Sequence, residues 1–165
     1  MTIRALCGGT AIALLGPAAA IGAAGRDGPA RDPASVNLCE EVPGGDVARA
    51  LGKALKTARP FSSKESRLGR CTYVLAAANA PEGPTEGYTL WLYGPGEYEA
   101  LARVTEGPVE KVAGFGDEAI LFHDPGDGRY KLRAVRRGRF TVEATTPDAE
   151  SARKLAQLGL ERLSR

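Results

Sequence analysis

The sequence predicts an α+β domain: an antiparallel sheet of about five strands with helices packed on one face. Three observations predict this class. The composition, 43% hydrophobic and 25% charged residues in a chain of 165, is typical of one ordinary soluble domain. Short β-rich runs alternate with turn residues, and apolar residues recur at helical spacing before, between and after these runs. The expected order of elements is α-β-β-α-β-β-β-α.

The start of the chain, residues 1–24, predicts a secretory signal peptide. Arg4 supplies the positive charge, residues 5–15 form the apolar run, and Pro17 ends that run before small residues. Cleavage after Ala20 and cleavage after Ala24 both fit the pattern. A membrane anchor is the alternative, but a spanning helix needs about 20 predominantly apolar residues, and glycines interrupt this stretch. We therefore expect an exported protein, whether periplasmic, secreted or associated with the cell envelope, with no transmembrane span in the mature chain.

Residues 25–37 combine glycine, proline and charged side chains without apolar periodicity, which predicts a flexible linker. A single α+β domain is expected over residues 38–165. Asp46 is expected to cap a first helix. The buried stripe of this helix is expected to contain Val47, Ala50, Leu51, Ala54 and Leu55. The polar segment 59–69 is expected to be irregular, and residues 70–76 and 88–93 predict two strands that pair as an antiparallel hairpin.

The second half of the domain begins with a short helix predicted over residues 96–104. Three strands are then expected at residues 118–123, 130–135 and 139–145, because turn residues separate these β-rich runs. Thr146 is expected to cap a final helix, with Pro147 at its first position. One face of this helix is apolar, so it is expected to pack on the sheet.

Two cysteines, Cys39 and Cys71, remain after the leader is removed. In an exported protein such a pair predicts a structural disulfide rather than a metal or redox site. A bridge closing a loop of this length stabilises a fold by about 3–4 kcal/mol in the chain-entropy model. A cysteine nucleophile would need a nearby base, and His123 is the only histidine in the chain.

No motif in the sequence predicts a catalytic residue, a cofactor or a metal site. His123 and Asp124 adjoin a turn and lack the spacing of further metal ligands. The segment 114–117 is glycine-rich, but Ala119 replaces the third glycine of a dinucleotide loop, so a tight turn into a strand is the better interpretation. With 22 basic and 20 acidic residues, the charge balance argues against nucleic acid as a partner. Carboxylates that converge only in the folded chain stay open as an alternative.

Trp91 and Tyr93 are the first candidate ligand-binding residues. Alternation along their strand places both on one face, and the apolar residues Leu90 and Leu92 on the other. If helices cover the leucine face, the two rings lie on the open face of the sheet and form a platform for a sugar ring, an acyl chain or a protein. The alternative is that another part of the chain buries them.

A basic run supplies the second candidate, with Arg133 and Arg137 as its chosen contacts. Strand alternation places Arg129, Lys131 and Arg133 on one face, and the following turn adds three arginines. An exported protein could use such a cluster to bind an anionic polymer or lipid head groups. The alternative is a solvated face whose cations pair with Glu143 and neighbouring acids.

Short motifs resemble a family of small secreted bacterial proteins, largely actinobacterial lipoproteins that carry a domain of unknown function. The motifs are Leu38-Cys39, the segment Arg70-Cys71-Thr72-Tyr73 and the segment Gly114-Phe115-Gly116-Asp117-Glu118-Ala119. The resemblance spans residues 38–146 and implies an extracytoplasmic α+β domain with a Cys39–Cys71 bridge. The lipid-attachment cysteine usual in those proteins has no counterpart here, and the family implies no catalytic residue.

The sequence thus favours an exported, non-enzymatic domain that binds through its open sheet face. The expected partner is an envelope glycan, an anionic polymer, a lipid head group or a protein, contacted by Trp91, Tyr93, Arg133 and Arg137. An extracytoplasmic hydrolase using distant acids and His123 is one alternative. A structural subunit of an envelope complex is another.

Overall fold

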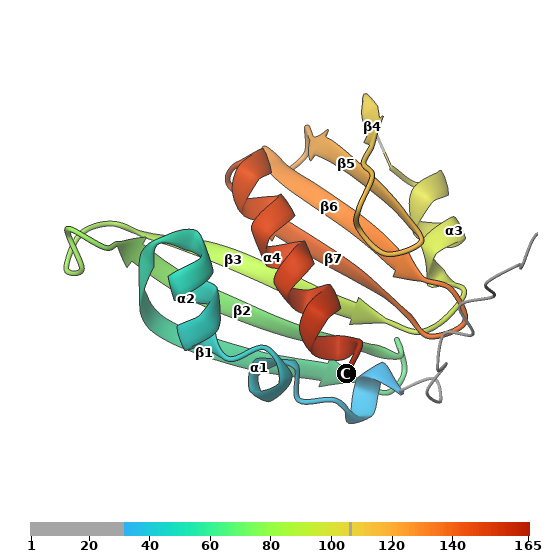
Figure 1. Cartoon of the computed structure of the whole chain (residues 1–165), viewed down its shortest axis with the longest axis horizontal. Coiled ribbons are helices and arrows are strands. Elements are labelled where there is room, and N and C mark those ends of the chain that lie inside the picture. Colours follow the sequence, from blue (N-terminus) through green and yellow to red (C-terminus); the bar gives the residue numbers. More distant parts are fainter. Residues whose placement is uncertain (1–31, 106) are drawn as a thin grey trace, which may run out of the picture.

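The structure, a computed structural model, describes residues 32–105 and 107–165. They form one seven-stranded antiparallel sheet in the order β1-β2-β3-β7-β6-β5-β4 (Figure 1). The strands are β1 (Lys53–Ser63), β2 (Leu68–Ala77), β3 (Thr85–Tyr93), β4 (Val109–Lys111), β5 (Glu118–Asp124), β6 (Arg129–Arg136) and β7 (Phe140–Thr146). The helices are the 3-10 turn η1 (Pro33–Ser35), α1 (Leu38–Glu41), α2 (Gly44–Leu51), α3 (Glu97–Arg103) and α4 (Ala149–Leu163).

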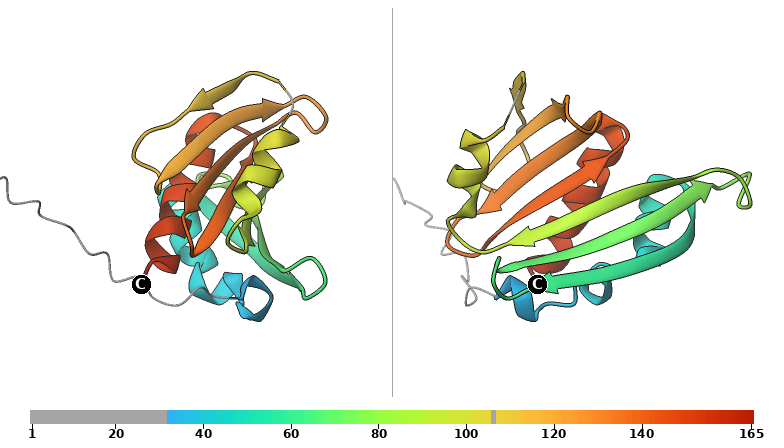
Figure 2. Two further views of the ribbon diagram at one scale, coloured as in Figure 1. Left: turned by 90° about the vertical axis from the view of Figure 1, so that its right-hand side faces the viewer. Right: turned by 180° about the vertical axis from the view of Figure 1, so that it is seen from behind.

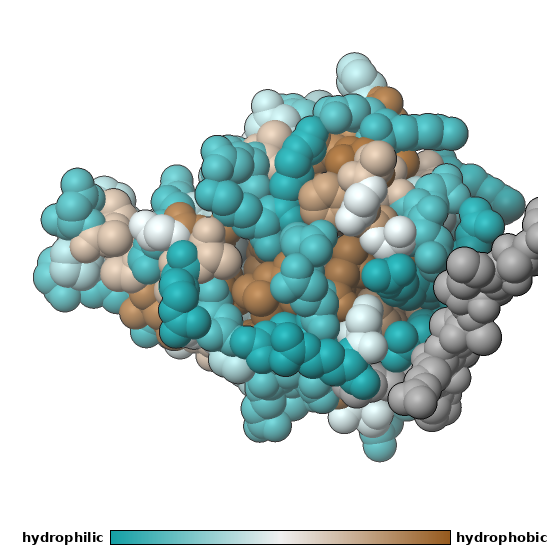
Figure 3. Space-filling view, viewed as in Figure 1, coloured by the Kyte–Doolittle hydropathy of each residue, from teal (hydrophilic) through white to brown (hydrophobic). Residues whose placement is uncertain are grey.

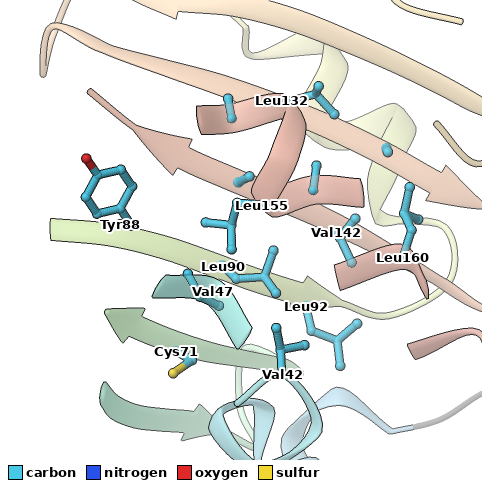
Figure 4. Packing of buried hydrophobic residues seen from close by; sticks show 14 of the residues in the cluster. Val42, Val47, Cys71, Tyr88, Leu90, Leu92, Leu132, Val142, Leu155 and Leu160 are labelled. Atoms are coloured by element: carbon cyan, nitrogen blue, oxygen red, sulfur yellow. The ribbon is translucent and has the colours of Figure 1, made fainter. Parts of the chain in front are cut away.

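Helices lie on both faces of the sheet, so the expectation that they share one face was wrong. α1, α2 and α4 cover one face (Figure 1). α3 lies against the opposite face beside β5, β6 and β7 (Figure 2). The core fills the space between the sheet and helices α1, α2 and α4 (Figure 4). Its fully buried side chains include Val47 of α2, Leu90 and Leu92 of β3, Val142 of β7 and Leu155 of α4.

The α+β class and the antiparallel sheet are confirmed, but the expected strand count and order were wrong because β1 and β4 were missed. The helix expected around Val47 is α2, and it ends at Leu51. Gly52 ends it because this residue adopts a left-handed conformation with φ of 63° and its N–H bonds to the carbonyls of Ala48 and Arg49. Leu55, expected in the buried helical stripe, instead lies in β1 and is 39% exposed. The segment expected to be irregular therefore contains the second half of β1 and the turn into β2.

Two helix caps differ from the expected ones. Asp46 lies inside the first turn of α2 rather than before it, and its carboxylate pairs with Arg49 and with Arg162 of α4. The final helix begins after Asp148, whose carboxylate accepts hydrogen bonds from the N–H and the hydroxyl of Ser151 at 2.8 and 2.7 Å. Asp148, rather than the expected Thr146, is thus the N-cap of α4.

The predicted Cys39–Cys71 disulfide is confirmed and joins α1 to β2, with the two Cα atoms 5.2 Å apart. The folded part starts before α1, because Pro33 of η1 is buried against β2. Residues 33–37 of the expected linker are therefore packed on the domain. The predicted signal peptide and residues 25–31 lie outside the described residues.

Within residues 32–105 and 107–165, no helix combines the length and the apolar character needed to cross a bilayer.

Candidate functional site

No helix of the described residues covers the face of β1–β3 that lies opposite α1 and α2 (Figure 2). We call this surface the open wing and define it by the outward-facing residues Arg59, Phe61, Arg70, Thr72, Thr89, Trp91 and Tyr93. These positions alternate with core residues, because neighbouring side chains in a strand point to opposite faces. Trp91 and Tyr93 thus face outward while Leu90 and Leu92 are buried.

Strand register gathers an arginine and three aromatic rings on the open wing. Phe61, Arg70 and Trp91 are direct cross-strand neighbours. The Arg70 guanidinium carbon lies 4.6 Å from the Phe61 ring centroid and 5.0 Å from that of Trp91, so the cation is held between two rings. Trp91 in turn stacks on Tyr93, with centroids 6.2 Å apart and planes 15° from parallel.

The Arg70 guanidinium has no acceptor among the described residues. Its Nε atom is buried without a hydrogen-bond partner, and neither terminal nitrogen takes part in a hydrogen bond or an ion pair. Arginine is almost always charged in proteins, so the open wing carries a half-buried positive charge with no acidic partner in residues 32–105 and 107–165.

Hydroxyl groups lie beside this cation. Thr72 and Thr89 are cross-strand neighbours one row from Arg70, and their Oγ1 atoms are 3.4 Å apart. Arg59, opposite Thr72 on β1, is exposed and has no ion pair within the described part of the chain. The outward positions of β1, β2 and β3 contain no aspartate or glutamate. The open wing is therefore cationic, aromatic and hydroxyl-bearing.

Tyr93 lies at the border between the open wing and the rest of the sheet. Burial raises the pKa of its phenol, and the nearby Glu143 raises this pKa further. Tyr93 is accordingly a neutral hydrogen-bonding group at neutral pH, and its half-buried ring supports Trp91.

Arg133, a predicted contact, is enclosed by the fold. It is 5% exposed, and its Nε and Nη2 atoms lie 2.7 and 2.5 Å from Oε2 of Glu143. Its Nη1 atom donates to the carbonyl of Leu101 at 2.6 Å and to the hydroxyl of Thr105 at 2.8 Å. Every nitrogen of this side chain is therefore bonded within the protein, and Arg133 ties β6 to β7 and to the end of α3.

Arg137, the other predicted cation, lies in the turn between β6 and β7. Its side chain is 71% exposed and pairs with Glu118 at 3.1 Å. Its neighbours in the basic run are also paired, Lys131 with Asp124 and Asp127 and Arg136 with Asp117. The structure thus brings Trp91 and Tyr93 together on β3, whereas Arg137 lies outside this pair, in the turn that joins β6 to β7, where Glu118 is its partner.

His123 lies at the exposed end of β5, where its ring meets the edge of Tyr130 with centroids 4.8 Å apart. A hollow of about 300 Å³ adjoins it, and Glu110 is the one acidic residue in its lining. In the described part of the chain, no three His, Cys, Asp or Glu side chains converge as metal ligands.

A second hollow, of about 370 Å³, lies on the helix-covered face. Apolar side chains gather there between α2 and α4 (Figure 3). Phe115, from the glycine-rich turn, and Leu158 of α4 form its apolar lining, and Arg153 and Glu161 lie at its margins.

Sequence reasoning missed Phe61, Arg70 and Arg59 as members of the site. The available signal was the period-two alternation along residues 57–63, in which Arg59 and Phe61 occupy the same face. Pro60 conceals this pattern because proline is depleted in strands, yet it is tolerated on an edge strand such as β1.

Comparisons with protein-family models, with curated proteins and with solved structures find no match to this chain. The resemblance to small secreted bacterial proteins therefore stays a prediction.

Proposed function

We propose that this chain is an exported, non-enzymatic domain that binds a component of the cell envelope on its open wing. The observation that carries the proposal is the row of half-exposed aromatic side chains on the face of β1–β3 that no described helix covers. Large apolar rings are normally buried, and here Phe61 is 47% exposed although a well-packed core is available on the other face.

The arrangement of these rings supports binding rather than packing. Phe61, Trp91 and Tyr93 come from two strands, and Arg70 holds the first two rings apart. Aromatic side chains with a polar neighbour provide contact area at a small cost in conformational entropy, which is why they are common in binding surfaces. The predicted leader and the disulfide support an extracytoplasmic setting, where an envelope polymer is a ligand within reach.

The binding test is co-sedimentation of the purified domain with envelope material from its native host. We expect Trp91→Ala with Tyr93→Ala to abolish sedimentation, because the double replacement removes the stacked pair. Phe61→Ala tests the same surface at an exposed position, where loss of the fold is not expected. Phe115→Ala, on the opposite face, is the matched control. Sedimentation unchanged by both open-wing variants, with the fold verified by circular dichroism, would refute the proposal.

Export is tested separately by the intact mass of the protein recovered from its native host. The expected result is the mass of a chain whose first residue is Ile21 or Gly25. This chain should gain two alkyl groups only after reduction. An uncleaved chain with three free thiols would contradict export.

A further inference from the structure

We infer that the ligand of the open wing is a glycan whose sugars carry carboxylates, and that Arg70 makes the charged contact. This inference rests on the proposed function and names the chemical class of its ligand.

Arg70 offers a planar charged group to a ligand. A guanidinium has its N–H donors in one plane, and it binds a carboxylate through two parallel hydrogen bonds. The Arg70 guanidinium carbon lies over both the Phe61 and the Trp91 ring, and its terminal nitrogens have no hydrogen-bond partner among the described residues, so they are the donors left for a ligand. The flanking rings also restrict the rotamers of this long side chain, which lowers the entropy lost on binding.

Arg70 differs from the cations of the neighbouring strands. Arg133, Arg136, Arg137 and Lys131 all pair with acidic side chains within the fold. Arg70 and Arg59 have no acidic partner in the described residues, and the outward positions of β1–β3 carry no acid. A half-buried cation left without a partner is costly unless an anion completes the site, so charge complementarity assigns an anionic ligand to this surface.

The groups beside Arg70 favour a carboxylated glycan over other anions. On the outward face of β2 and β3 Arg70 is the one cation, and it is flanked by rings, which matches one monoanionic group of the ligand. Thr72 and Thr89 offer hydroxyls next to it, suited to the hydroxyls of a sugar. Trp91 and Tyr93 supply an apolar surface for the sugar carbons. Together these groups fit a chain of sugar acids.

The test measures binding of the full domain to polygalacturonate, to alginate and to methyl-esterified polygalacturonate by affinity electrophoresis. The ester keeps the sugar backbone and removes the charge. We expect the intact protein to bind the two polyuronates at least tenfold more tightly than the ester. Arg70→Gln is expected to weaken polyuronate binding by about tenfold or more, since it removes a charged two-point contact. Arg70→Lys keeps the charge but not the fork, so it is expected to recover only part of the loss.

Arg49→Gln is the matched control, because Arg49 lies on α2, is 80% exposed and changes the net charge equally. We expect its affinity to stay within twofold of that of the unchanged protein. Trp91→Ala tests the open wing independently of charge.

Each other outcome has a defined meaning. Equal binding of the ester, or equal losses for Arg70→Gln and Arg49→Gln, would overturn the carboxylate assignment. Displacement by inorganic phosphate but not by galacturonate would overturn it in favour of a phosphate ligand. Failure to bind either polyuronate, combined with sedimentation on envelope material that depends on Trp91, would overturn this inference while leaving the proposed function intact. Failure in both assays would overturn both.

Discussion

Arg133 and Arg70 belong to one cross-strand row, yet the fold treats them in opposite ways. The row runs from Phe61 through Arg70 and Trp91 to Glu143 and Arg133. At its β6 end, Glu143 and the end of α3 surround the arginine with acceptors. On β2, near the other end of the row, the aromatic rings of β1 and β3 flank the arginine and supply no acceptor.

Burial and pairing together therefore separate the cation that joins structural elements, Arg133, from the one that we propose binds a ligand, Arg70. A buried charge that keeps every hydrogen bond holds elements together. A half-buried charge without an acceptor leaves a polar site for a ligand. The number of basic residues in a run does not separate the two, since the dense run on β6 is the neutralised one.

The largest effect is expected when buried Arg133 loses its acidic partner. Glu143→Ala leaves Arg133 buried without a counter-charge, and we expect the free energy of unfolding to fall by about 3–5 kcal/mol in urea titrations. Arg133→Met with Glu143→Leu removes both charges and should cost clearly less. Arg70→Gln removes only the ring contacts, so its loss should be near 1 kcal/mol. Equal losses for Glu143→Ala and Arg70→Gln would contradict the comparison.

The disulfide is expected to have the next largest effect, and this effect should fall on the open wing. Cys71 directly follows Arg70 on β2, and its bridge to Cys39 spans 32 positions of sequence. Replacing both cysteines by alanine should lower the free energy of unfolding by about 3–4 kcal/mol. Hydrogen exchange should accelerate more in β1 and β2 than in β6 and β7. A uniform acceleration would show that the two halves of the sheet share one stability.

Two turn glycines next to β6 provide a smaller test in the half of the sheet that contains Arg133. Gly116 and Gly138 both have left-handed φ angles, 63° and 72°. A Cβ on Gly116 would lie 2.4 Å from the Val135 carbonyl oxygen, whereas one on Gly138 would have no neighbour within 4 Å. Gly138→Ala should therefore cost about 1–2 kcal/mol, and Gly116→Ala roughly 2–4 kcal/mol because a steric clash is added. Equal changes in the melting temperature would contradict this account.

The smallest expected effect is a pH dependence at the start of β3, on the helix-covered face of the sheet. The Tyr88 hydroxyl donates to Glu86 at 2.7 Å, and Lys53 lies 3.1 Å from the same oxygen. The hydrogen bond from Tyr88, followed by that from Lys53, lowers the pKa of Glu86. A carboxyl whose pKa is lowered by folding contributes stability above its unfolded pKa, near 4.3, and loses this contribution as the pH falls through its folded pKa.

Glu86→Gln should accordingly flatten the fall of unfolding free energy below about pH 4.3. Tyr88→Phe should flatten it in the same direction, because it removes the hydrogen bond that lowers the pKa of Glu86 most. An unchanged acid limb in both variants would exclude Glu86 as a contributor.

The parts of the fold that were predictable are those with local signals. The β2–β3 hairpin, β5, β6 and β7 carry β-rich runs bounded by turn residues, and α4 has an apolar face over fifteen residues. β1 escaped prediction because only one of its sides is paired, so an edge strand can be polar and can contain Pro60. β4 has three residues, too few for a periodic signal.

The candidate site was predictable only as far as strand alternation reaches. Alternation places Trp91 and Tyr93 on the same face, and it places Arg133 outward with Glu143 as a possible partner. It does not place Arg70 beside Trp91, because the register between β2 and β3 depends on pairing rather than on local sequence. The burial of Arg133 under α3 also depends on tertiary contacts.

The order of the sheet has a consequence for how the chain folds. β3 is joined on one side to β2, its neighbour in sequence, and on the other to β7, the last strand. Pairing between such distant segments is slow to form, because a long loop must close before any contact rewards it. Until β7 arrives, β3 presents an unpaired edge and the core side chains of α4 are missing. A newly made chain is therefore most exposed to aggregation just before its final strand and helix are added, and a chaperone that shields the β3 edge at that stage should raise the yield of refolding most.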